Sequence, residues 1–154
     1  LGIAIKDPYQ LESSLCDMNG LQGLGLLDMD TILEKEKNLV RKEGIHKDSG
    51  QKVFGYEIHH GISTNTDQPV IKFSDNSVCG TSVKGKKVWG SYLHGIFDAD
   101  EFRRWFIDSL RKKKGLAAKG KVVSPYDLEA SFDNLADVVR DAVDVGEIYK
   151  IMGL

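Results

Sequence analysis

The chain is 154 residues long, with 41% hydrophobic residues, 29% charged residues and a formal net charge of -2. This composition is typical of a folded domain and argues against disorder, and the nearly balanced charge gives no electrostatic reason to expect nucleic acid as a partner. No apolar run approaches the ~20 residues that span a bilayer, and two cysteines without close spacing indicate reduced thiols of a cytoplasmic protein.

The first segment, residues 1–5, is apolar and does not begin with Met. It predicts the end of a helix, stopped at Asp7-Pro8 because the residue before a proline avoids helical geometry. We therefore expect the chain to be part of a longer protein and residues 1–154 to form a single, partial domain. In residues 21–27 glycines and leucines alternate, which favours a tight loop and a short buried strand.

The middle of the chain predicts strands over 37–43, 52–59 and 70–73. The polar connection 44–50 contains His46, which is expected to be solvated. Two further runs, 77–83 and 87–93, are predicted to pair around Gly85, because glycine supplies the positive φ of a tight hairpin.

Two helical segments are predicted in the last third of the chain. In the first, Asp98 is the expected cap, with Glu101 three residues later and Gly115 at the end. The apolar face of this helix has helical spacing and consists of Phe102, Trp105, Phe106 and Leu110. Residues 116–124 are then predicted to be a linker to a C-terminal helix over 125–151, with Ser124 as its cap. This order of elements indicates an α/β or α+β fold.

Among the histidines, His94 is the candidate for chemistry. It directly follows the apolar run 88–93 and precedes Gly95, and strand ends lead into the ligand crevice of open α/β sheets. Because imidazole titrates near neutral pH, a histidine at this point is suited to take a proton from a nucleophile and return it to a leaving group. On spacing alone, a histidine hydrogen-bonded to the backbone at a strand end is the favoured interpretation.

A second feature is the segment 55–61, in which two glycines bracket an aromatic residue, an acid and two imidazoles. Strand alternation places Tyr56, Ile58 and His60 on one face and Glu57 and His59 on the other. Glu57 and His59 are therefore a predicted polar pair. A metal site is the competing interpretation, but two groups on one face are too few for a closed site, so no metal is expected.

The two cysteines are interpreted as structural residues. A nucleophilic cysteine needs surroundings that lower its pKa, such as a sharp turn before a helix. Cys16 has the anionic Asp17 beside it, and Cys79 lies inside a predicted strand.

Three segments resemble signatures of the amidotransferase domain of cobyric acid synthase, a class I glutamine amidotransferase. They are residues 23–27, residues 55–61, and the run Tyr92-Leu93-His94-Gly95-Ile96-Phe97-Asp98. Residues 1–8 are also similar to the stretch that follows the cysteine elbow of that family, so the resemblance extends from Leu1 to about Trp105. It implies an α/β fold: the C-terminal part of a flavodoxin-like domain, with a mixed sheet flanked by helices.

The resemblance also implies a function. The full enzyme would be a glutamine-dependent amidoligase of cobalamin biosynthesis that uses ATP and magnesium, bound by an N-terminal synthetase domain, to amidate carboxylates of a corrin. The domain that this chain resembles would hydrolyse glutamine, with His94 as general base and acid and with Tyr56, Glu57 and His59 lining or supporting the glutamine pocket. The nucleophilic cysteine would precede Leu1, so the chain alone is expected to bind no cofactor and to lack glutaminase activity.

One departure concerns the group that orients the catalytic histidine. Many class I amidotransferases have Glu two residues after it, whereas this chain has Ile96, which leaves Asp98 and Glu57 as candidates. Two other interpretations remain open at this point: the related cobyrinic acid a,c-diamide synthase, and a non-catalytic remnant that acts as a binding or regulatory module.

Overall fold

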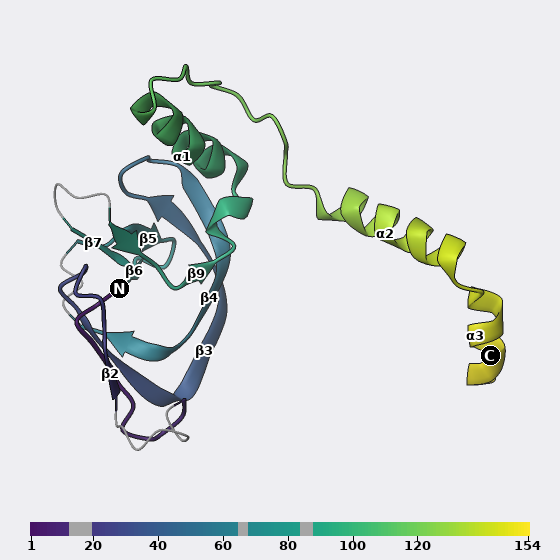
Figure 1. Cartoon of the computed structure of the whole chain (residues 1–154), viewed down its shortest axis with the longest axis horizontal. Coiled ribbons are helices and arrows are strands. Elements are labelled where there is room, and N and C mark those ends of the chain that lie inside the picture. The colour runs from purple at the N-terminus through teal and green to yellow at the C-terminus, as the bar shows by residue number, and fades with distance from the viewer. Residues whose placement is uncertain (13–19, 65–67, 84–87) are drawn as a thin grey trace. The chain divides into compact units, whose positions relative to one another are not determined.

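A long antiparallel hairpin forms the frame of the protein, whose computed structural model describes residues 1–12, 20–64, 68–83 and 88–154. Its strands are β3 (Asp30–His46) and β4 (Lys52–Ser63), shown in Figure 1. Strands were predicted over 37–43 and 52–59, and both extend further than that. The register of β3 against β4 shifts between Leu33 and Asn38, so the hairpin contains a bulge.

The other strands complete a mixed sheet, as predicted. In the path β2-β1-β3-β4-β9, β1 (Ala4–Lys6) runs parallel to β3, whereas β2 (Gly20–Gln22) and β9 (Leu93–His94) run antiparallel to their neighbours. Strand β5 (Ile71–Phe73) pairs with the end of β3, and β6 (Val78–Cys79) pairs with β5. The predicted helix end at residues 1–5 was wrong, because the backbone of Ala4–Lys6 pairs with Asp30–Ile32.

A two-stranded sheet of β7 (Thr81–Ser82) and β8 (Trp89–Gly90) confirms that the runs 77–83 and 87–93 pair. Each run is nevertheless split into two short strands. Gly80 separates β6 from β7 with a φ of 78°, in the left-handed region that favours glycine. The predicted turn at Gly85 lies outside the described residues.

One helix packs beside the hairpin. A 3₁₀ turn, η1 (Ile96–Asp98), leads into α1 (Asp100–Lys113), and Phe102 of α1 is fully buried. The expected cap at Asp98 was wrong, because Ala99 is the N-cap and makes no side-chain cap hydrogen bond. The helix ends just before Gly115, as predicted, where φ is 72°. The buried apolar core comprises Val53, Val70, Ile71, Phe73, Cys79, Leu93, Ile96, Ala99 and Phe102.

His46 lies against this core, and the prediction that it is solvated was wrong. Its side chain is 3% exposed, and its ring lies 4.8 Å from that of Phe102 and 5.2 Å from that of Trp105, measured between centroids. Ser49 satisfies Nδ1 through its hydroxyl at 2.9 Å. Burial lowers the pKa of His46, an effect that the nearby Asp48 carboxylate partly offsets.

The segment after α1 is held along that helix by one carboxylate. Asp108 accepts hydrogen bonds from the backbone N–H groups of Lys119 and Gly120, both at 2.9 Å, and pairs with Arg104 at 2.7 Å. These donors lower the pKa of Asp108. The first half of the predicted linker 116–124 is thus tied down by side-chain contacts.

The chain divides into two compact units, Leu1–Val122 and Val123–Leu154, where the sequence predicted one domain. The second unit contains α2 (Leu128–Ala142) and α3 (Val145–Met152), where one helix over 125–151 was predicted. Asp127, and not Ser124, caps α2 by accepting from Ala130 N–H at 3.1 Å. The extended backbone of Val143 ends α2. Within the described ranges, no helix is long and apolar enough to cross a membrane.

Candidate functional site

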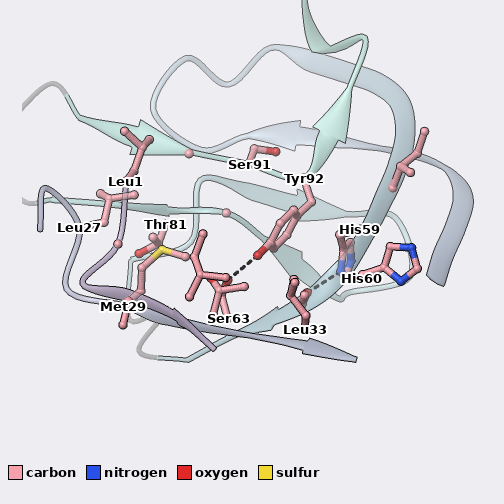
Figure 2. Close-up of a pocket in the computed structure, with 18 of the residues that line it drawn as sticks. Leu1, Leu27, Met29, Leu33, His59, His60, Ser63, Thr81, Ser91 and Tyr92 are labelled. Atoms are coloured by element: carbon pink, nitrogen blue, oxygen red, sulfur yellow. Dashed lines mark hydrogen bonds between the residues drawn. The ribbon is translucent and has the colours of Figure 1, made fainter. Parts of the chain in front are cut away.

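A cavity of about 510 Å³ opens between β1, the β3–β4 hairpin and the segment that precedes β9 (Figure 2). Most of its exposed lining surface is apolar, and several polar side chains also reach it, which is the usual character of a small-molecule pocket. The apolar lining includes Leu1, Ala4, Ile5, Leu27, Met29, Leu33 and Ile58. The polar lining includes Thr31, His59, His60, Ser63, Ser91, Tyr92 and His94.

His94 is the last residue of β9 and lines this cavity with an exposed side chain. The structure therefore places it at a strand end before a glycine, as the sequence predicted. The backbone of His94 passes close to Gly55, where an added Cβ would come within 2.0 Å of the His94 carbonyl oxygen. Gly95 then turns the chain with a φ of 79°. The imidazole is accessible, and the same cavity is lined by the first residues of the chain, Leu1 and Gly2.

The predicted pair of Glu57 and His59 is present. Oε1 of Glu57 lies 3.7 Å from Nε2 of His59, and the two side chains share the face that alternation assigned to them. Nδ1 of His59 donates to the carbonyl oxygen of Gly61 at 2.7 Å, since a carbonyl can only accept. Nε2 of the same ring lies 3.3 Å from the amide nitrogen of Asn38. His59 is thus held in one orientation.

The other predicted site residues lie near this pair without all reaching the cavity. The described lining includes His59 but neither Tyr56 nor Glu57. Tyr56 is 51% exposed and is the register partner of His94 in the β4–β9 pairing. Of the two carboxylates considered as orienting groups for His94, Glu57 is engaged with His59.

A row of hydroxyls in the cavity was missed by the sequence analysis. The ring of Tyr92 stacks on His59, with centroids 4.3 Å apart and an interplanar angle of 25°. The Tyr92 hydroxyl lies 2.6 Å from Ser63 Oγ, which lies 2.9 Å from Thr31 Oγ1 (Figure 2). The available signal was the position of Tyr92 two residues before His94, which places both side chains on one face of an extended segment.

The described cysteine is a poor nucleophile. Cys79 is buried, and burial raises the pKa of its thiol, although a contact from Ser91 Oγ at 3.6 Å opposes the shift. Cys16 lies outside the described residues. In the described part of the chain, no three His, Cys, Asp or Glu side chains form a group that could hold a metal ion.

Comparisons with known proteins agree with these features. The model of the CobB/CobQ-like glutamine amidotransferase domain matches residues 1–102. The chain is 42% identical over 156 residues to the adenosylcobalamin biosynthesis bifunctional protein CobDQ of Leptospira interrogans, a match that covers 100% of this chain and 18% of that protein.

Two cobyric acid synthases are similar to the chain as well. That of Nitratidesulfovibrio vulgaris is 49% identical over 110 residues, covering 68% of this chain and 20% of the relative. That of Clostridium acetobutylicum is 40% identical over 159 residues, covering 100% of this chain and 32% of the relative. The chain thus spans about a fifth to a third of the length of these curated relatives.

Proposed function

The chain belongs to the CobB/CobQ-like glutamine amidotransferase family, and we propose that it is the C-terminal part of the glutaminase domain of a cobyric acid synthase. The relatives that carry this name are 40% and 49% identical to it. The observation that carries the proposal is the exposed His94 imidazole on the wall of a cavity that residues Leu1 and Gly2 also line. A side chain supplied by a segment just before Leu1 would therefore lie close to this cavity.

The proposed reaction is the hydrolysis of the side-chain amide of glutamine. A cysteine thiol supplied from outside this chain gives its proton to His94, and its sulfur attacks the amide carbon. The C–N bond breaks as His94 returns the proton to the nitrogen, so ammonia leaves and a thioester remains. Water then attacks the thioester carbon as His94 accepts its proton, and the C–S bond breaks as His94 returns that proton to the sulfur, so glutamate is released and the thiol is restored.

We assign His59, Glu57 and Tyr56 to the glutamine pocket in different roles. His59 lines the cavity and presents a ring whose two nitrogens are already directed by Gly61 and Asn38. Glu57 supports that ring, because its carboxylate oxygen Oε1 lies 3.7 Å from Nε2 of His59. Tyr56 supports the site from the neighbouring strand position opposite His94.

The remaining chemistry is assigned to a synthetase domain outside this chain. There, ATP and magnesium would activate carboxylates of a corrin, and the ammonia released from glutamine would convert them to amides. We assign the magnesium to that domain and not to any residue that the structure describes. The name of the relatives, cobyric acid synthase, supports this larger reaction.

The test uses the full-length protein that contains this chain. His94→Ala should lower glutamine-dependent ammonia release about 10²- to 10⁴-fold, the usual contribution of a general acid–base. It should leave amidation driven by added ammonia unchanged, because that reaction does not use the glutaminase site. Arg140→Ala, at an exposed position on α2, is the control and should behave as wild type. Glutaminase activity of His94→Ala within a few-fold of wild type would refute the proposal.

A further inference from the structure

His94 is attached to the rest of the sheet by very little structure of its own. Strand β9 has two residues, and its described strand partner is β4 alone, with Leu93 opposite Glu57 and His94 opposite Tyr56. A two-residue ladder does not by itself fix a side chain to the tolerance that proton transfer requires. The residues just before β9 must therefore contribute to the position of the imidazole.

Tyr92 makes those additional contacts. Its ring stacks on His59 at 4.3 Å, its hydroxyl lies 2.6 Å from Ser63 Oγ, and its carbonyl oxygen accepts from Ile58 N–H at 3.3 Å. The three partners are all residues of β4. In Figure 2 the Tyr92 ring extends across the cavity from its own segment toward Ser63, with His59 beside it.

The two side chains that Tyr92 contacts, His59 and Ser63, are themselves held in place by further hydrogen bonds. His59 is tied through Nδ1 to the Gly61 carbonyl and through Nε2 to the Asn38 amide, so its ring plane is set by two partners. Ser63 is likewise held by Thr31 of β3 at 2.9 Å. Because the Tyr92 side chain contacts both of these fixed groups, it restricts the position of its own backbone, two residues before His94.

We propose that Tyr92 is a positioning residue for His94: the stack of its ring on His59 sets the backbone that presents the imidazole to the cavity, and the hydrogen bond to Ser63 adds a smaller contribution. This inference rests on the proposed function of His94. Tyr92 itself need not touch the reacting atoms, so its removal should affect the chemical step more than the affinity for glutamine.

Two variants separate the stack from the hydroxyl. Tyr92→Leu removes both contacts, and in the full-length protein it should lower the glutaminase kcat about 10- to 100-fold, because displacing a catalytic group by about 1 Å costs up to that much. The KM for glutamine should change less than about threefold. Tyr92→Phe keeps the stack and should retain kcat within about threefold of wild type. Tyr149→Leu, at an exposed tyrosine of α3, is the matched control.

A spectroscopic readout tests the geometry without relying on activity. In the 154-residue chain, the four histidines give imidazole Cε1–H signals, and that of His94 is assigned from its loss in His94→Gln. Tyr92→Leu should shift or double this signal and should also shift that of His59, which loses the stacked ring. Tyr92→Phe and Tyr149→Leu should leave the His94 signal in place.

The outcomes distinguish the positioning role of Tyr92 from the proposed function of His94. A His94 signal that is identical in Tyr92→Leu and wild type overturns the positioning role, whatever the activity. If Tyr92→Leu does not fold, Tyr92→Met replaces it in the same test, because it also removes the stacked ring and the hydroxyl, and an unchanged His94 signal there counts equally against the proposal. A normal glutaminase rate in His94→Ala, by contrast, refutes the proposed function and leaves the signal comparison to decide the geometry.

Discussion

Replacing His46 with phenylalanine is expected to make the first unit less sensitive to acid. His46 is 3% exposed and packs against the rings of Phe102 and Trp105, and burial lowers its pKa below the usual value. The unfolded chain therefore binds a proton that the folded chain resists, so stability is fully present above the unfolded pKa of about 6.5 and falls as the pH drops below it. One such group changes the free energy of unfolding by at most about 1.4 kcal/mol per pH unit.

The assay is urea unfolding at pH 8 and pH 5.5. The lower value is one pH unit below the unfolded pKa of the histidine. Between the two values, the free energy of unfolding should fall by up to about 1.4 kcal/mol more in wild type than in His46→Phe. The comparison within each protein removes any change in packing caused by the larger ring. His60→Gln is the matched control, because His60 lies on β4 outside the core cluster. Its free energy of unfolding should depend on pH as that of wild type does, since His46 is unchanged. An equal loss of stability in His46→Phe and wild type would show that this reasoning is wrong.

Two further predictions concern backbone groups. Asp108→Asn should speed amide hydrogen exchange at Lys119 and Gly120 roughly tenfold, because a neutral amide is a weaker acceptor for their N–H groups; unchanged exchange would contradict the assigned role of the carboxylate. Gly55→Ala should lower the free energy of unfolding by about 1–3 kcal/mol, because its Cβ would lie 2.0 Å from the His94 carbonyl oxygen; a wild-type urea midpoint would contradict that close approach.

The sequence predicted those parts of the site that depend on local pattern. Strand alternation was enough to place Glu57 and His59 on one face, and the structure shows them 3.7 Å apart. A histidine between an apolar strand and a glycine was enough to single out His94, whose side chain is exposed at the cavity. Both inferences need only the two-residue period of a strand and the steric freedom of glycine.

Features that depend on distant neighbours were not predictable in the same way. His46 stands in a polar stretch of sequence, and its burial follows from the extension of β3 and from the aromatic face of α1, more than fifty residues later in the chain. Residues 1–5 are not flanked by a strand-like pattern in the sequence, and the strand that pairs with them, β3, begins only at Asp30. The role that we propose for Tyr92 rests on a stack with His59 across two strands.

Helix caps were predicted from composition alone and were misplaced by a few residues. Asp98 and Ser124 have the right chemistry, but the helices begin after Ala99 and Asp127. Several neighbouring residues can serve as a cap, so the backbone path into the helix decides which one does.

The bulge in the β3–β4 hairpin divides it into two independently aligned halves. On one side of the step, Thr31–Leu33 pair with Gly61–Ser63, and on the other, Asn38–Ile45 pair with Lys52–His59. The cavity is lined from both halves, by Ser63 from the first and by His59 from the second. Residues 34–37 therefore link two parts of the cavity lining that are aligned by separate sets of strand pairs. A change in the length of this link would move Ser63 relative to His59, and with it the two groups that contact Tyr92.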